Sequence, residues 1–410
     1  MQCIVYTKAI SFRWGYVQRT IPNVGHLFES LEEAIKDHLI PALVGREVSS
    51  TEREILGLPV RFGGLGIFNP AMAAEREYNS SRRITAPLVE LILKQELTLD
   101  NLDKQRMKDI KTKLKNEKEQ DYKNQLLELL KTIPPKLKRC IEICREKGAS
   151  SWLTALPIKA LGYSLNKAEF HNSIHIRYNW DIPGLPSTCA CGEKNSTDHA
   201  LICKKGGYPI LRHNAICQTE AIIMKEAGCT DVRLEPHLLP VNPKLFKRQT
   251  NCQDDARLDI SARGIYGTYE RTFCDVRVTH PNCPSGVFKP IKEIYSSHEQ
   301  QKKTEYEERV IQSEKGSFVP LVFTTLGGMA PSCDSLNKKL AERISEKRNE
   351  RYSHVISHLR TRLRFSLLRG ILVSITGERG KPKYRSNNGD EDLYNVSFNL
   401  IPSGQTYEMP

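Results

Sequence analysis

The sequence contains no run of apolar residues that approaches the roughly 18 needed to cross a membrane. Its first residues also lack the basic, apolar and small-residue regions of a secretory signal peptide. We therefore expect an intracellular protein. Its 12 cysteines are scattered, except for one cluster that includes a histidine, and this favours metal binding over disulfide bonds in a reducing compartment.

A nucleotide-binding loop is also missing. Three glycines (Gly63, Gly64 and Gly66) are closely spaced, but no Gly-Lys-Ser/Thr follows them and no clear strand precedes them. We interpret this stretch as a packed turn between helices. Residues 1–148 as a whole are expected to form a helical region, which includes a long, charge-rich exposed helix over residues 100–131.

Positive charge is in excess. The formal net charge is +13 and the isoelectric point is about 9.1, which makes a polyanion the expected class of partner. Residues 334–386 hold 14 Lys and Arg against 5 Asp and Glu. Two helices with one apolar stripe each are expected there, and Arg360 and Arg364 on the second are candidate contacts to nucleic-acid phosphates. Solvated helix faces are the alternative interpretation of such charge.

Four potential metal ligands lie within 15 consecutive residues. They are three cysteines and one histidine: Cys189, Cys191, His199 and Cys203. Thiolates and imidazole are the ligands that tetrahedral Zn²⁺ prefers, so the spacing predicts a zinc knuckle. Because four protein ligands close the coordination sphere, we expect a structural and not a catalytic ion. Lys204 and Lys205, directly after the last cysteine, are candidate phosphate contacts.

The segment after this cluster alternates between helix-like and strand-like patterns. Helices are expected over 208–227 and 291–313, and strands over 231–236, 256–266, 271–279 and 318–323. We therefore expect an α+β fold. The order α, β, β, β, α, β resembles the core of restriction-endonuclease-like enzymes, which hydrolyse phosphodiesters with Mg²⁺ held between carboxylates on neighbouring strands.

Two aspartates, Asp259 and Asp275, lie on the second and third of these strands. Adjacent strands can bring both carboxylates to one Mg²⁺ ion, and Glu220 on the preceding helix is a candidate third ligand. A structural alternative exists for each, because aspartate at a strand end often forms a turn.

A cation near the metal is also expected. Enzymes of this kind usually carry lysine two residues after the second carboxylate, where this sequence has Arg277. Arginine holds phosphate well, but it does not lose a proton and is a poor activator of water. Lys302 or Lys303, on the next helix, is the expected replacement; the alternative is a plain helix surface.

Taken in order, these motifs resemble the C-terminal part of non-LTR retrotransposon polyproteins that carry a restriction-like endonuclease. The resemblance rests on the knuckle, followed by Lys-Gly-Gly, Arg-His-Asn, Arg-x-Asp, Asp-x-Arg-Val and Lys-x-x-Tyr. The Leu-Pro-x-Arg-x-Gly-Gly-Leu-Gly-Ile stretch at residues 58–67 is similar to the region that follows the reverse transcriptase palm. The resemblance implies a nuclear enzyme that nicks target DNA, so that a 3′-hydroxyl primes reverse transcription of the element RNA.

Several residues take roles through this resemblance. Asp259 and Asp275 match the metal-binding carboxylates of the family. Arg212 and His213 match a basic pair near the active site, and Lys303 matches its helical lysine.

The sequence departs from the family in two respects. Leu258 stands where the family usually has proline before the first carboxylate. The polymerase signature, an aromatic-x-Asp-Asp hairpin, is absent, because the pair Asp254-Asp255 follows Cys252-Gln253 without flanking apolar strands. We therefore expect that the palm is missing and that the chain is a fragment or a truncated copy.

The expected organisation has four parts. They are a helical region (1–148), a linker with the zinc knuckle (149–207), a restriction-like endonuclease domain with basic C-terminal helices (208–376), and a disordered tail (377–410). The leading hypothesis is a Mg²⁺-dependent DNA endonuclease with a structural zinc ion. One alternative is an inactive nucleic-acid-binding remnant, and another is a basic adaptor that has no role with nucleic acid.

Overall fold

The protein is a mixed α+β chain that divides into two compact units. The computed structural model describes residues 10–95, 98 and 100–377. The units are Met1–Ile141 and Glu142–Pro410. Among the described residues, no helix combines the length and the apolar character needed to cross a membrane.

The division falls inside helix α8 (Pro135–Cys144), a few residues before the boundary expected after residue 148. The knuckle and the segment expected to be a nuclease domain belong to the same unit. The tail expected to be disordered lies outside the described residues, apart from Gly377.

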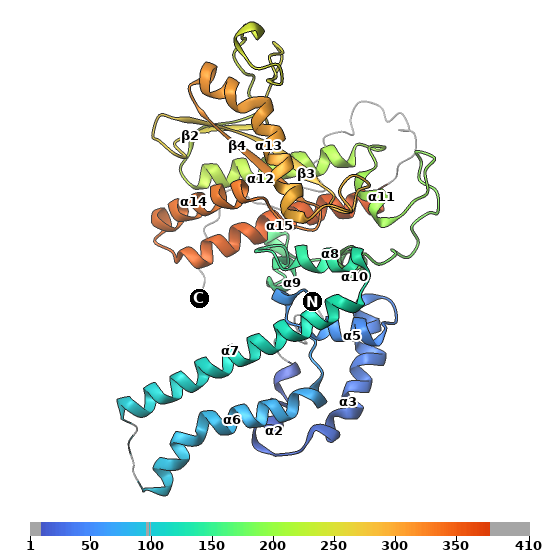
Figure 1. The fold of residues 1–410 in the computed structure, drawn as a ribbon, viewed down its shortest axis with the longest axis vertical. Coiled ribbons are helices and arrows are strands. Elements are labelled where there is room, and N and C mark those ends of the chain that lie inside the picture. Colours follow the sequence, from blue (N-terminus) through green and yellow to red (C-terminus); the bar gives the residue numbers. More distant parts are fainter. Residues whose placement is uncertain (1–9, 96–97, 99, 378–410) are drawn as a thin grey trace. The chain divides into compact units, whose positions relative to one another are not determined.

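The described part of the first unit is built from helices (Figure 1). Its elements before α8 are η1 (Ile10–Phe12), α2 (Gly15–Thr20), η2 (Gly25–Phe28), α3 (Glu29–Ala34), η3 (Ile35–Leu39), α4 (Ile40–Val44), α5 (Ser50–Gly57), η4 (Val60–Phe62), α6 (Pro70–Leu93) and α7 (Asn101–Thr132). Helices α6 and α7 run side by side (Figure 1), and ion pairs such as Lys118–Glu77 at 2.9 Å join them. Helix α7 corresponds to the long helix expected over residues 100–131.

The three closely spaced glycines form the turn between α5 and α6. Gly63 has a φ of 93°, in the left-handed region that favours glycine. A Cβ atom on Gly64 would collide with the carbonyl oxygens of Leu58 and Ile55. The glycines therefore allow two stretches of backbone to approach closely, as in the packed turn expected from the sequence.

The second unit contains a four-stranded sheet. Its strands, in the order in which they are hydrogen-bonded, are β1 (Thr230–Leu234), β2 (Ile260–Arg263), β3 (Arg271–Thr279) and β4 (Ser317–Thr324). The first two pairings are antiparallel, and β3 pairs with β4 in parallel. A parallel pair needs a long crossover, which α13 (Ile291–Arg309) and the π-helical turn η7 (Val310–Glu314) supply.

The remaining elements of this unit are helical. They are α9 (Ser151–Thr154), η5 (Lys159–Leu161), α10 (Lys167–Tyr178), α11 (Thr197–Ile202), α12 (Tyr208–Glu226), η6 (Pro243–Leu245), α14 (Pro331–Arg348) and α15 (Tyr352–Thr376). The chain therefore follows the order α12, β1, β2, β3, α13, β4, which is the α, β, β, β, α, β order expected from the sequence.

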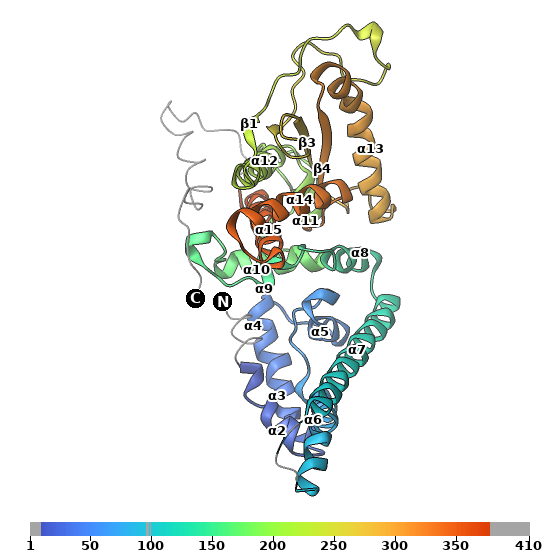
Figure 2. The same cartoon turned by 90° about the vertical axis from the view of Figure 1, so that its left-hand side faces the viewer.

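Helices cover the sheet, with α13 and α12 on different sides (Figure 2). On the α13 side, an apolar cluster joins the sheet to the helix and to the long β1–β2 connection; it contains Leu238, Ala256, Leu258, Phe273, Tyr306, Val310 and Phe318. Side chains alternate between the two faces of a strand, so Asp275 lies on the same face as Phe273. Cys274 is completely buried on the opposite face.

Helix α15 is packed between other helices and is not an exposed basic surface. It contacts α12 and α14 as well as α9, α10 and α11. Its leucines point inward as expected, but Arg362 and Arg364 are also buried. A helix surrounded on several sides has too little solvent-facing surface for all of its arginines.

Candidate functional site

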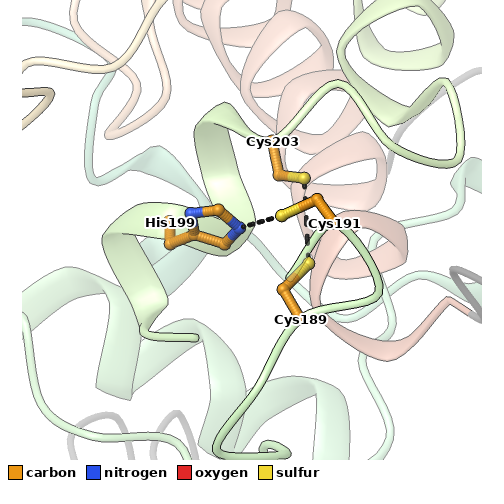
Figure 3. Close-up of side chains that lie close together, drawn as sticks. All are labelled: Cys189, Cys191, His199 and Cys203. Atoms are coloured by element: carbon orange, nitrogen blue, oxygen red, sulfur yellow. Dashed lines mark hydrogen bonds between the residues drawn. The ribbon is translucent and has the colours of Figure 1, made fainter. Parts of the chain in front are cut away.

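The four predicted zinc ligands meet in space (Figure 3). Cys189 and Cys191 lie on a tight turn, in which the N–H of Gly192 donates to the carbonyl of Cys189 and Gly192 has a φ of 94°. His199 lies on α11, and Cys203 is the residue at which that helix ends. The local turn and the first helical turns after it therefore position all four side chains.

The geometry of this cluster fits a tetrahedral ion. All four ligand atoms lie within 4.8 Å of one another. The sulfur atoms of Cys189 and Cys203 are 3.8 Å apart, and Cys191 Sγ is 3.3 Å from His199 Nε2. Zinc–sulfur bonds of about 2.3 Å in a tetrahedron give a sulfur–sulfur distance of about 3.8 Å. The cluster can therefore bind a metal ion such as zinc.

Buried polar side chains attach α11 to the rest of the unit. The Nε2–H of His280 donates to the carboxylate of Asp198 (3.0 Å), and His280 Nδ1 is hydrogen-bonded to the hydroxyl of Thr325 (2.7 Å). Arg212 donates from Nη1 to the carbonyl of Leu201 at 2.6 Å. Burial lowers the pKa of Arg212 to about 10. Arg212 therefore points into the protein and binds the knuckle helix α11. The sequence had indicated Arg212 as a nucleic-acid contact.

Lys204 and Lys205 follow the last ligand and are both exposed. Their ammonium groups reach solvent next to the knuckle, as a phosphate contact requires.

The two aspartates expected to hold Mg²⁺ lie close together where β2 starts. The antiparallel ladder ends at the pair Ile260–Cys274, and Asp259 directly precedes β2. Its N–H donates to the carbonyl of Cys274 and its Oδ2 accepts from the N–H of Val276, so Asp259 contacts the residues on either side of Asp275. Backbone bonds hold Asp259 between two strands, because its N–H donates to Cys274 and its carbonyl accepts from Glu235.

Each carboxylate of this pair has its own partners. Asp259 accepts a hydrogen bond from the N–H of Val276 on Oδ2 (2.6 Å), and its Oδ1 lies 3.1 Å from His213 Nε2. Asp275 Oδ2 lies 2.9 Å from Lys302 Nζ. Burial, followed by the negative charge of Asp259, raises the pKa of Asp275 to about 6, although Lys302 opposes this shift. Two neighbouring carboxylates in a partly buried site can both be ionised only when a cation lies close to them.

Of the two candidate lysines, Lys302 is the one at the site. Burial acts to lower its pKa, but Asp275 and then Glu305 outweigh burial, so the pKa of Lys302 is raised and the side chain is charged. Lys303 forms no ion pair with any described residue. Consecutive helical residues point about 100° apart, so one helix presents only one of the two toward Asp275.

Arg277 points from β3 to the same helix, where it donates to Gln301 at 2.8 Å. It lies two residues after Asp275 and therefore on the same face of the sheet. The site therefore has two cationic side chains. Lys302 contacts the carboxylate of Asp275, and Arg277 lies near Asp275 on the same strand.

Glu220 does not join the two aspartates. It is fully buried and accepts a hydrogen bond from Asn337 on α14 at 3.0 Å. Burial raises its pKa to about 7. Glu220 and His213 are seven residues apart on α12, which is two helical turns and about 10 Å along the axis. The helix that brings His213 to Asp259 therefore carries Glu220 away from it.

The arginines predicted to bind phosphate on α15 have protein partners. Arg360 donates to Asp334 at 2.7 Å, and Arg364 donates from Nε to the carbonyl of Ala149 at 2.9 Å. Arg364 is 6% exposed, and burial lowers its pKa to about 10. Both side chains are therefore bonded to other residues inside the unit. The sequence pattern had indicated that they would be exposed.

Two cavities open in the second unit, and Asp259 lines the first of them. One, of about 410 Å³, is lined by residues that include His213, Arg257 and Asp259. The other, of about 850 Å³, has a polar lining from the β1–β2 connection and α13, which includes Gln253 and Glu305. The connection is held in place by Arg309, whose guanidinium donates to the carbonyls of Leu239, Asn251 and Gln253.

Sequence reasoning missed Cys217, Glu305 and Gln301 at this site. The signal for Cys217 was its position four residues after His213, which places both on one face of a helix. Glu305 and Gln301 gave no comparable signal, because polar residues on a charged helix are common.

No protein-family model matches the chain, and no curated protein matches it.

Proposed function

We propose that the second unit is a Mg²⁺-dependent endonuclease module of a retroelement, which nicks DNA to free a 3′-hydroxyl. The observation that carries the proposal is the closeness of Asp259 to Asp275, since Asp259 Oδ2 accepts from the N–H of Val276, together with Lys302 at 2.9 Å from Asp275. This combination of two carboxylates and one amine is what metal-dependent phosphodiester hydrolysis needs.

The topology supports the same proposal. A helix, three antiparallel strands, a crossover helix and a fourth, parallel strand form one unit. We assign it to a restriction-endonuclease-like core, in which Asp275 lies on β3 and Asp259 directly precedes β2. A fold of this kind hosts many functions, so the proposal depends on the site more than on the topology.

Each residue has a role in the proposed reaction. A bound Mg²⁺ supplies a Lewis acid and lowers the pKa of the attacking water. Asp259 and Asp275 hold that ion. Lys302 stabilises negative charge beside Asp275, and Arg277 binds an oxygen of the scissile phosphate through its planar guanidinium. His213 fixes the orientation of the Asp259 carboxylate by a hydrogen bond at 3.1 Å.

The knuckle has a supporting role in this proposal. Its four protein ligands leave no open coordination position, so a zinc ion bound there stabilises the fold and does not take part in hydrolysis. Lys204 and Lys205 are exposed beside it and contact the phosphates of the substrate. The partners are the DNA target and the element RNA, and the location is the nucleus.

A second candidate function is an inactive nucleic-acid-binding remnant. It is favoured by the partners of Asp259, because both of its carboxylate oxygens already have a contact within 3.1 Å. Leu258 in place of proline points in the same direction. This candidate retains the knuckle and the exposed Lys204 and Lys205 but cleaves nothing.

A plasmid-nicking assay with Mg²⁺ separates the two candidates. Wild type should convert supercoiled DNA to the open circle, and Asp275→Asn should reduce the rate at least about 100-fold. Asp121→Asn, an exposed aspartate on α7, is the matched control and should nick as wild type does. If wild type and Asp275→Asn are equally inert and both bind DNA, the remnant is correct.

A further inference from the structure

A second group of metal-binding side chains lies next to the acidic pair. His213 and Cys217 are four residues apart on α12 and face the start of β2, where Asp259 lies. His213 Nε2 is 3.1 Å from Asp259 Oδ1 and 3.4 Å from Cys217 Sγ. The ligand atoms of all three residues lie within 4.8 Å of one another. A single ion can therefore touch an imidazole nitrogen, a thiolate and a carboxylate oxygen.

The protein holds these atoms in place. Residues four apart on a helix project side by side, so α12 fixes the distance between His213 and Cys217. The N–H of Val276 holds Asp259 Oδ2 at 2.6 Å, which leaves Oδ1 directed at His213. Cys217 is 6% exposed and cannot turn to solvent without disturbing the core.

The group is also accessible from outside. His213 and Asp259 line the cavity of about 410 Å³, and their side chains are 28% and 22% exposed. Three protein ligands with an open fourth position are typical of zinc sites that exchange a water or another small ligand. The knuckle, in contrast, uses four protein ligands and offers no such position.

The ligand set also selects the ion. Thiolate and imidazole favour Zn²⁺, Co²⁺ and Cd²⁺, whereas Mg²⁺ prefers oxygen ligands. An ion that binds here replaces the protons on Cys217 Sγ and His213 Nε2 and takes Asp259 Oδ1 as its third ligand. While such an ion is bound, the Asp259 carboxylate cannot also bind Mg²⁺ in the same side-chain orientation.

We propose that His213, Cys217 and Asp259 form a second site for a zinc-like divalent ion, which competes with Mg²⁺ for Asp259 and thereby inhibits the nuclease. The binding of the ion stands on this geometry alone. The inhibition rests on the proposed function.

Metal content tests the binding. After equilibration with Zn²⁺ and removal of free ions, wild type should hold about two zinc ions per chain, and Cys217→Ser should hold about one. Cys229→Ser, another buried cysteine of the same unit, is the matched control and should keep about two. Equal zinc content in wild type and Cys217→Ser would overturn the proposal.

A second variant guards against misfolding of Cys217→Ser. Asp259→Asn changes a partly exposed residue and removes one ligand without removing a buried atom. Its affinity for Zn²⁺ at this site should fall at least about 10-fold, as measured by competition with a chromogenic chelator. An unchanged affinity in this variant would also contradict the site.

The inhibition is measured separately. Micromolar Zn²⁺ should slow Mg²⁺-dependent nicking by wild type, and it should slow Cys217→Ser much less, each protein being compared with its own rate without Zn²⁺. Equal inhibition of wild type and Cys217→Ser by Zn²⁺ would contradict the proposal that this site inhibits the nuclease. If wild type does not nick at all, the proposed function fails, while the zinc count still decides whether the site exists.

Discussion

Lys302 and Asp275 form an ion pair of 2.9 Å between α13 and β3. The crossover between two parallel strands brings them together, because α13 must lie on the face of the sheet that carries Asp275. Lys302 also lies 5.3 Å from the centre of the Tyr306 ring, which restricts the ammonium group further. Lys302, from the crossover helix, is thus the cation that contacts the carboxylate of Asp275, and Arg277 is not.

The first prediction concerns the choice between adjacent lysines. Lys302→Ala should reduce Mg²⁺-dependent nicking about 100-fold or more, because the transition state loses a nearby positive charge. Lys303→Ala is the matched control and should change the rate less than about threefold. Rates on supercoiled plasmid at saturating Mg²⁺ measure both. A larger loss with Lys303→Ala than with Lys302→Ala would contradict the placement of α13.

The second prediction concerns pH. The pKa of Asp275 is raised to about 6, and only the ionised carboxylate binds Mg²⁺ well. Below that pH, the Mg²⁺ concentration for half-maximal nicking should rise about tenfold per pH unit. Nicking rates measured over a Mg²⁺ series at several pH values give this dependence. A requirement for Mg²⁺ that is constant across this range would show that Asp275 does not bind the ion.

The same raised pKa affects stability with a definite sign. A carboxyl group with a raised pKa in the folded state favours folding while it is protonated, so this contribution is lost as the pH rises from about 4 to about 6. Asp275→Asn removes the titration, and its free energy of unfolding should change less over this range than that of wild type. Urea unfolding at several pH values without Mg²⁺ measures the difference.

The third prediction concerns the knuckle. Cys203→Ser should lose one bound zinc ion and destabilise the second unit by at least about 3 kcal/mol, since metal binding contributes directly to folding. Cys252→Ser, outside both clusters, should keep the wild-type zinc content and stability. Metal analysis and thermal melts are the measurements. A chelator that leaves the wild-type melting temperature unchanged would contradict a structural role for the ion.

The fourth prediction concerns Arg364. Its burial next to the carbonyl of Ala149 makes it a core residue, so Arg364→Ala should destabilise the unit by about 2–4 kcal/mol through the cavity it leaves. Arg364→Met keeps most of the volume and should cost less. Both variants, where folded, should bind DNA with the same dependence on salt as wild type. If DNA binding by these variants depends less on salt than that of wild type, Arg364 contacts phosphate after all.

Local spacing along the chain was sufficient for some features. The four knuckle ligands were found from sequence because a short turn and two helical turns determine their positions, whatever the rest of the fold does. The order of helices and strands from α12 to β4 was also predictable, because each element has its own apolar periodicity. Asp259 and Asp275 could be expected close together because strands that follow one another across a short turn usually lie side by side.

The tertiary structure decided what spacing leaves open. Lys302 and Lys303 are equivalent in sequence, and only the rotation of α13 against the sheet selects one of them. Arg212 and Arg364 look like surface charges in sequence, because long charged side chains are rarely buried, yet helix packing encloses them. The meeting of Cys217 with Asp259 and the removal of Glu220 from the acidic pair depend on how α12 crosses β2 and β3. Such contacts join residues far apart in the chain, and their geometry follows from the packing of whole elements and not from any local pattern.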